Sequence, residues 1–254
     1  MSLQGKVAVV TGASRGIGRA IAIRLAEDGA LLAINYQKNA AAAAEAVHQI
    51  EAAGGNAFAL QGDLGSVPGV CRFFDALDAE LHQRRGHSRF DILVNNAGIG
   101  RQGTVETTSE AVFDELVAVN LKGPFFVAQQ AITRLQSGGR VINLSSALSR
   151  HPLSDMAAYS MTKAAINLFT VVLAADLGKR AITDNALAPG LTVTDFTAHA
   201  RRDAQVVQQV SAHTALGRLG EVNDIAGVAA WLASDDAGWV TGQYIEASGG
   251  IGMV

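Results

Sequence analysis

The sequence of 254 residues has little of what several classes of protein need. Its single cysteine, Cys71, excludes an internal disulfide and a zinc site built on cysteines. With only four prolines, 49% hydrophobic and 17% charged residues, it cannot be a disordered or collagen-like chain. No stretch reaches the roughly 18 uninterrupted apolar residues of a membrane span, and residues 1–6 carry no apolar signal segment. We therefore expect a soluble, cytoplasmic protein with no membrane role.

An excess of charge of either sign is also missing. The 20 Lys and Arg nearly balance the 23 Asp and Glu, so the net charge is −3 and offers no basic surface for nucleic acid. None of the six histidines has a partner at metal-ligand spacing, so we predict no metal site. For His151 an exposed, non-catalytic role is expected.

Short apolar runs alternate with longer helical stretches along the chain. Strands are expected at residues 7–10, 31–35, 57–60, 92–94, 141–144 and 182–187, and the clearest helices at 17–28, 40–53 and 157–177. Continuous apolar runs indicate strands covered on both faces, as in a parallel sheet with crossover helices. We predict an α/β fold: a single doubly wound, Rossmann-like parallel sheet with helices on both faces and a ligand site at the carboxyl ends of its strands.

The chain shows no internal repeat or linker, so residues 1–254 are expected to form a single domain. Two segments look inserted. Residues 82–89 are polar and predict a surface loop. Residues 192–214 are less apolar and follow the sixth expected strand, where a mobile lid would cover the site.

A glycine-rich turn, TGASRGIG at residues 11–18, joins the first expected strand to the first helix. A dinucleotide diphosphate needs close backbone approach, free N–H groups and a helix N-terminus. Gly12, Gly16 and Gly18 supply these openings, although their spacing differs from the common G-x-G-x-x-G. The turn therefore predicts a dinucleotide-binding domain.

The residues after the second strand indicate which dinucleotide is bound. An acid there would bind the ribose 2′-hydroxyl and repel a 2′-phosphate. Residues 35–38 are instead Asn-Tyr-Gln-Lys, and Arg15 adds a positive charge from the glycine turn. These charges favour NADP over NAD, the alternative being that Lys38 and Arg15 are solvated surface charges.

Taken together, the motifs resemble those of the short-chain dehydrogenase/reductase family over essentially the whole chain. The matching motifs are TGASRGIG at 11–18, NNAG at 95–98, YSMTK at 159–163, Pro189-Gly190 with Thr194, GRLG at 217–220 and VTGQ at 240–243. Ser146 lies 13 residues before Tyr159, as the family pattern expects, and Asn120 fits its fourth catalytic position. The resemblance implies tetramers, or dimers, assembled through helices expected at 115–137 and 157–177.

The resemblance also implies which residues contact the coenzyme. They are Gly12, Ser14, Arg15, Gly16, Ile17, Gly18, Tyr36, Lys38, Asp63, Leu64, Asn96, Ala97, Gly98, Tyr159, Lys163, Pro189, Gly190, Thr192 and Thr194. Asp63 matches the position near the adenine ring, and Pro189 to Thr194 the segment beside the nicotinamide.

The Tyr/Lys pair can perform acid–base chemistry. Tyr159 and Lys163 are four residues apart and therefore share one face of a helix. A nearby ammonium is expected to move the pKa of the phenol from about 10 toward neutrality. Tyr159 would then protonate a carbonyl during reduction, Ser146 would donate to its oxygen, and Asn120 would hold a relay water. Ser145 is the alternative to Ser146, but the spacing to Tyr159 favours Ser146.

Asp184 departs from the family pattern because it lies inside an expected strand where an apolar or small residue is usual. A buried carboxylate is costly unless it is paired. We expect it to bind neighbouring backbone, to face a subunit contact or to lie at an exposed edge.

The expected substrate is a small-molecule ketone, either a 3-oxoacyl thioester or a carbonyl of secondary metabolism. The residues expected around it are Ser146, Tyr159, Leu148, Leu153, Met156, Leu191 and Phe196. Acyl carrier protein is weakly supported as a partner: Lys179-Arg180 supply a basic half-patch, but residues 135–137, read as a helix end, are neutral. The alternatives are an NAD-dependent alcohol dehydrogenase working oxidatively and a non-catalytic dinucleotide sensor.

Overall fold

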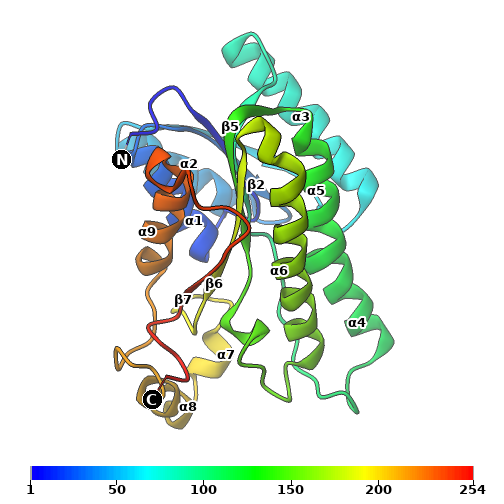
Figure 1. Ribbon diagram of the computed structural model, residues 1–254, viewed down its shortest axis with the longest axis vertical. Coiled ribbons are helices and arrows are strands. Elements are labelled where there is room, and N and C mark those ends of the chain that lie inside the picture. Colours follow the sequence, from blue (N-terminus) through cyan, green and yellow to red (C-terminus); the bar gives the residue numbers. More distant parts are fainter. Residues whose placement is uncertain (1, 254) are drawn as a thin grey trace.

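Seven parallel strands form one sheet in a computed structural model that describes residues 2–253 (Figure 1). Their order is β3-β2-β1-β4-β5-β6-β7. The strands are β1 (Val7–Val10), β2 (Leu31–Tyr36), β3 (Asn56–Gln61), β4 (Phe90–Asn95), β5 (Leu135–Leu144), β6 (Thr183–Pro189) and β7 (Tyr244–Ala247). The order reverses between β1 and β4, and this switch point is where doubly wound sheets open a crevice for ligands.

Helices cover both faces of the sheet, as the sequence predicts. They are α1 (Gly16–Glu27), α2 (Ala40–Ala52), α3 (Val67–Arg85), α4 (Glu110–Val117), α5 (Gly123–Ile132), α6 (Ala157–Leu177), α7 (Ala198–Arg201), α8 (Ala204–Ala212) and α9 (Val222–Ala233). In Figure 1 α1, α2 and α9 lie on one side of the sheet and α3 to α6 on the other. Each layer encloses its own apolar core, and α7 and α8 lie beyond the lower end of the strands.

One predicted helix is wrong. Residues 115–137 divide into the end of α4, a π-helical turn at Ala118–Lys122, α5 and the first residues of β5. Leu135 pairs with Phe90 of β4, and the register shifts before Arg140 pairs with Ile92. The long β5 therefore begins where a helix end was expected, because strand pairing with β4 outweighs the apolar pattern that resembled a helix.

Two further differences concern element ends. The polar segment at 82–89 is a loop only from Gly86, because α3 continues to Arg85 and ends on Gly86 in the left-handed conformation (φ 76°). The edge strand β7 has no counterpart among the expected strands. Its residues, Tyr-Ile-Glu-Ala, are all only partly buried, so they lack the continuous apolar run that marks the inner strands.

By length and composition alone, the segment Ala157–Arg180, which contains α6, could cross a membrane. Its inner face is buried in the core against the sheet: Ile166, Leu173 and Leu177 are each 5% exposed or less. A core helix of this kind passes the same test, so the finding is weak evidence for a membrane span.

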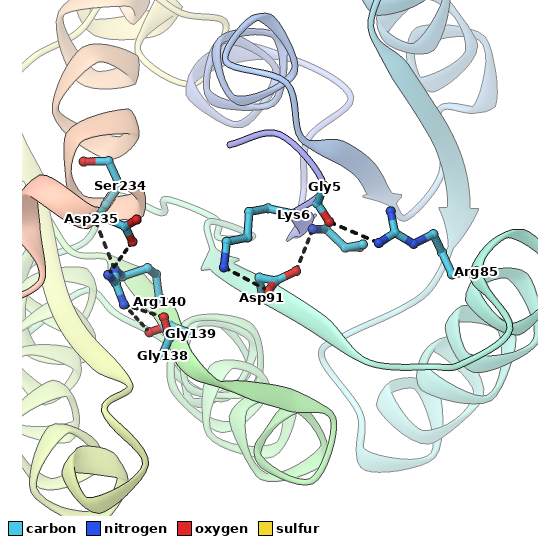
Figure 2. Close-up of polar contacts among 10 residues, drawn as sticks. Gly5, Lys6, Arg85, Asp91, Gly138, Gly139, Arg140, Ser234 and Asp235 are labelled. Atoms are coloured by element: carbon cyan, nitrogen blue, oxygen red, sulfur yellow. Dashed lines mark hydrogen bonds and ion pairs between the residues drawn. The ribbon is translucent and has the colours of Figure 1, made fainter. Parts of the chain in front are cut away.

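The amino ends of the strands are closed by charged side chains (Figure 2). Asp91 accepts from the amide of Val7 at 2.9 Å and from Lys6 Nζ at 3.4 Å. Arg140, only 7% exposed, donates to the carbonyl groups of Gly139 and Ser234 at 3.1 Å each. The second carbonyl belongs to the C-cap of α9, so Arg140 satisfies a helix end that would otherwise be unpaired.

Candidate active site

The glycine turn follows β1 and is fastened to the end of β4. Asn96 Nδ2 donates to the carbonyl of Thr11 at 2.8 Å, and the amide of Ala97 donates to Thr11 Oγ1 at 3.0 Å. Gly12 has a φ of 61°, and a Cβ on it would lie 2.9 Å from the Cα of Ala97. Asn96 and Ala97, predicted to touch the coenzyme, therefore also hold the turn in shape.

The start of α1 is suited to a diphosphate. The backbone of Arg15, the N-cap residue, is extended. Among the residues that the structure describes, no side chain caps the helix from this position, and the first turn carries no acid. The leading amide groups and the positive end of the helix dipole can thus receive an anion. Gly16 has a φ of 59°, and a Cβ on it would meet Thr194 at 3.6 Å. Residues from the turn and from the segment after β6 consequently flank the same space, which fits a bound dinucleotide.

The end of β2 carries the side chains predicted to choose the coenzyme. Lys38 is exposed, and Gln37 Nε2 donates to Asp63 Oδ1 at 2.8 Å, which restrains the acid expected near the adenine. Arg15 lies 3.5 Å from Asp195, and both side chains are largely exposed, so this ion pair is weak. Arg15 and Lys38 therefore remain accessible to a phosphate.

The catalytic candidates lie at the opposite side of the switch point. Tyr159 and Lys163 are in the first two turns of α6 and are 7% and 5% exposed. Lys163 Nζ lies 5.9 Å from the centre of the Tyr159 ring and donates to the carbonyl of Leu144, at the end of β5, at 2.7 Å. Ser146 follows that strand and hydrogen-bonds Tyr159. The sequence prediction that these three residues come together is thus realised in the structure.

The expected pKa of Tyr159 was wrong for the protein by itself. Burial raises the pKa of Tyr159 to about 12, partly offset by the hydrogen bond with Ser146, which lowers it. Burial lowers the pKa of Lys163 to about 8, because its ammonium is removed from water. A phenol that keeps its proton at neutral pH is suited to act as an acid, which is the role that carbonyl reduction requires.

Asn120 lies in the π-helical turn between α4 and α5 and is completely buried. Its side-chain amide pairs with the backbone of Ile99 in both directions: Nδ2 donates to the carbonyl at 2.9 Å, and Oδ1 accepts from the N–H at 2.8 Å. A Cβ on Gly98 would lie 3.2 Å from Asn120 Oδ1 and 3.6 Å from Lys163 Nζ. Asn120 therefore holds the segment after β4 beside Lys163, and its predicted relay water stays a prediction.

Of the residues expected around the substrate, some lie near Tyr159 and others are exposed to solvent. Leu148 and Met156 pack against the small apolar cluster that contains Tyr159, whereas Leu153 is 55% exposed. Phe196, in the predicted lid segment (residues 192–214), lies over Tyr159 with ring centres 6.1 Å apart. A Cβ on Gly100 would meet the Phe196 ring, so the two touch closely. A phenyl ring thus lies beside Tyr159, and it belongs to the segment predicted to be a lid, which contains α7 and α8.

The segment expected beside the nicotinamide begins where β6 ends at Pro189. Gly190 is packed against Ser248, since a Cβ on it would lie 2.9 Å from the Ser248 Cα. Thr192 is buried, and its Oγ1 donates to the carbonyl of Gly190 at 3.0 Å, while Leu191 is partly exposed. The segment therefore has a fixed start.

Two further expectations need correction. Asp184 is completely buried, and its two oxygens accept from Asn143 Nδ2 on β5 at 3.0 and 3.2 Å. It therefore binds a side chain on the neighbouring strand, which none of the expected arrangements included. Arg180, proposed for carrier-protein docking, donates to the carbonyl of Ile132 at 2.6 Å and is partly buried in the fold.

Sequence reasoning missed two polar residues around Ser146. Asn167 is on α6 and Ser149 is in the short 3₁₀ helix after β5 (Ala147–Ser149), and Asn167 Nδ2 donates to Ser149 Oγ at 3.0 Å. The signal for Asn167 was available, because it follows Lys163 by four residues and so shares its helix face.

Comparison with known proteins adds a family model described as "Enoyl-(Acyl carrier protein) reductase", which matches residues 12–252. The angucycline C-6 ketoreductase LanV, solved with bound NADP, is 43% identical with a TM-score of 0.95, over 100% of this chain and 98% of that one. The promiscuous reductase LugOII is 42% identical with a TM-score of 0.94, over 100% of both chains. Versicolorin reductase 1 of Aspergillus parasiticus is 40% identical over 98% of this chain and 97% of its own length.

Proposed function

Because the chain belongs to the short-chain dehydrogenase/reductase family, we propose that it reduces a ketone to a secondary alcohol with NADPH. The observation that carries this proposal is the meeting of Tyr159, Ser146 and Lys163 beside the glycine turn, at the carboxyl ends of the strands. The coenzyme supplies the hydride, and the protein supplies position and electrostatics.

Each catalytic residue has a defined role in this reaction. Tyr159 donates its proton to the carbonyl oxygen, and its raised pKa keeps the proton available at neutral pH. Ser146 donates a hydrogen bond to the same oxygen, where negative charge develops. Lys163, when protonated, favours the phenolate left behind and binds ribose hydroxyls. Because its pKa is about 8, it is mostly protonated at pH 7.

The 2′-phosphate of NADPH is recognised by Lys38 and Arg15. Both are exposed cations on the glycine-turn side of the crevice, and the end of β2 carries no acid to repel the phosphate. The bound NADP of LanV supports the same choice.

The substrate is a fused-ring aromatic ketone rather than a carrier-bound thioester. The surroundings of Tyr159 are apolar and partly aromatic, because its ring lies near that of Phe196 and because Leu148 and Met156 pack against the cluster that contains it. The relatives named as versicolorin and angucycline reductases support that class. Carrier docking loses one of the two cations of its basic half-patch, because Arg180 donates to the backbone of α5.

The protein assembles as a homotetramer, or as a homodimer, through the α4–α6 side of the sheet. Six large apolar side chains are at least 39% exposed there: Phe113, Phe125, Met161, Leu168, Val171 and Val172. Burying them against a second copy would remove apolar surface from water.

The test is binding and turnover of NADPH and NADH, measured side by side with wild type and Tyr159→Phe. The ketone panel contains 1-tetralone, larger fused-ring ketones and acetoacetyl thioesters. We expect NADPH to bind tighter and turnover of a fused-ring ketone to fall by about 100-fold or more in Tyr159→Phe, with binding retained. Retained turnover in Tyr159→Phe would remove the tyrosine from its proposed role.

A charge reversal tests the coenzyme choice separately. Lys38→Glu is expected to weaken NADPH binding by about 10- to 100-fold, because a charge-assisted contact becomes a repulsion. The affinity for NADH should change little. Equal effects on both coenzymes would show that Lys38 does not read the 2′-phosphate.

A further inference from the structure

The backbone on both sides of Ser146 is held by hydrogen bonds that the reaction does not itself use. Ser145 precedes the catalytic serine, and Ser149 follows it after one 3₁₀ turn. The side chain of Asn167 contacts the hydroxyls of both: its Oδ1 accepts from Ser145 Oγ at 2.6 Å, and its Nδ2 donates to Ser149 Oγ at 3.0 Å. One amide group on α6 thus brackets the catalytic serine.

The direction of these bonds is determined by the number of protons available. Ser149 Oγ lies 2.7 Å from the carbonyl oxygen of Ser146, which can only accept, so the single hydroxyl proton of Ser149 is used there. Towards its other neighbours Ser149 Oγ must then accept, and the nearer of them is the amide nitrogen of Asn167 at 3.0 Å, with the Tyr244 hydroxyl at 3.5 Å. This leaves Asn167 Oδ1 facing Ser145, whose hydroxyl donates to it. All members are therefore satisfied in one arrangement.

The same bonds join the serine loop to the helix that carries the catalytic pair. Asn167 is one turn after Lys163, and Ser145 Oγ also lies 3.3 Å from the Lys163 carbonyl. Any shift of the loop relative to α6 would stretch these contacts. The position of the Ser146 hydroxyl relative to Tyr159 is consequently coupled to Asn167.

Strand β7 provides a second support from the other side. The hydroxyl of Tyr244 lies 3.4 Å from the Ser146 carbonyl and 3.1 Å from Glu246 Oε2. The guanidinium carbon of Arg150 lies 3.8 Å from the centre of the Tyr244 ring, which further restrains the loop. The Ser146 carbonyl is therefore contacted by Ser149, which Asn167 of α6 holds, and by Tyr244 of β7.

We propose that Asn167 is a positioning residue for Ser146, and that with Ser145 and Ser149 it forms a clamp which fixes the serine hydroxyl against Tyr159 and the substrate oxygen. The proposal rests on the catalytic role given to Ser146 above. A clamp matters here because displacement of a catalytic group by 1 Å can cost about 100-fold in rate. A merely structural Asn167 would instead contribute to stability alone.

The test compares Asn167→Ala and Ser149→Ala with Ser149→Thr, which keeps the hydroxyl. Thr170→Val is the matched control, because it removes a buried hydrogen bond three residues along the same helix, between Asn143 Nδ2 and Thr170 Oγ1. Substrates are 1-tetralone and its alcohol, or the panel ketone that reacts fastest. Ser146→Ala is measured in parallel.

We expect Asn167→Ala and Ser149→Ala to lower kcat about 10- to 100-fold with KM for NADPH unchanged. Ser149→Thr should recover most of the loss, and Thr170→Val should lose stability while keeping kcat. The hydrogen bond from Ser146 lowers the pKa of Tyr159. Variants that displace the Ser146 hydroxyl should therefore raise the pKa of Tyr159. The rising limb of the pH profile for alcohol oxidation should then move to higher pH.

Three results would overturn the proposal. The first is an Asn167→Ala enzyme that loses stability as Thr170→Val does but keeps both kcat and the pH limb. The second is wild-type kcat in Ser149→Ala, a variant that remains informative if Asn167→Ala does not fold. The third is wild-type turnover in Ser146→Ala, which would remove the serine's catalytic role and the clamp with it. A kcat loss in Ser146→Ala together with wild-type kcat in the Asn167 and Ser149 variants would overturn the clamp alone and leave the role of the serine standing.

Discussion

The two ends of the sheet differ in how the charges of their buried side chains are stabilised. At the amino ends, Arg140 is surrounded by backbone carbonyls and Asp91 by an amide and a lysine, so each charge is satisfied (Figure 2). At the carboxyl ends, Lys163 and Tyr159 are buried where burial shifts both pKa values against the charged form. The first arrangement closes helix and strand ends, whereas the second keeps reactive groups in unfavourable surroundings. This difference separates side chains that stabilise the fold from those that we propose perform the chemistry.

The largest expected effect is at the carboxyl end. Lys163→Met should lower turnover by about 100-fold or more, because the charge that favours phenolate is lost. Its effect on stability should depend on pH. The folded pKa of Lys163, about 8, lies below the unfolded value of 10.5, so wild type gains stability as pH rises between them, by at most about 1.4 kcal/mol per pH unit. Urea unfolding from pH 7 to 10 should show a smaller gain in the variant, and equal gains would contradict the assignment.

At the amino end we expect the reverse pattern from Arg140→Met. Removing the guanidinium leaves the carbonyls of Gly139 and Ser234 without their partner in a nearly closed site. The free energy of unfolding should fall by about 1–3 kcal/mol, with kcat unchanged in the fraction that is folded. Denaturant titration and assay of the same samples check this. A lowered kcat in fully folded Arg140→Met would contradict the view that the amino end serves stability alone.

Asp184 is the second residue of β6, one register position from the row of Arg140, and it carries a buried acid. Burial is the main cause that raises the pKa of Asp184 well above 3.8, opposed by the hydrogen bond from Asn143. Because the folded pKa is raised, wild type loses stability as pH rises from about 4 through the folded pKa, by at most about 1.4 kcal/mol per unit. Asp184→Asn should lack this loss and be more stable than wild type at neutral pH, with the advantage shrinking toward pH 4. Thermal unfolding from pH 4 to 8 measures the slope.

The smallest effect is expected for Lys6→Met at the amino end. Lys6 Nζ is 3.4 Å from Asp91, and the lysine side chain is 43% exposed, so water screens the pair. We expect a loss below about 1 kcal/mol, smaller than that of Arg140→Met, and diminishing with added salt. A loss as large as that of Arg140→Met would show that exposure does not distinguish the two sites.

Much of the fold followed from local pattern. Strand β1 and helix α6 lie at the predicted residues, because each combines a distinct apolar pattern with a clear boundary. The family prediction is confirmed, and so is the prediction of ketone reduction with NADP, since the motifs are specific in order and spacing. The errors at residues 115–137 and at β7 arose where pairing with a distant strand decided the structure. Cytoplasmic location, the tetramer and the individual site residues stay predictions.

The sequence by itself determined the chemistry-bearing residues of this protein and the sheet that carries them. The tyrosine and lysine share a helix face because of their spacing, and the glycines permit the turn because they have no Cβ. Only the tertiary structure decided what surrounds these groups: the burial that raises the pKa of Tyr159, the partner of Asp184, and the bracket of Asn167 around Ser146. Solvent exclusion and hydrogen bonds between distant segments exist only once the strands and helices have packed together.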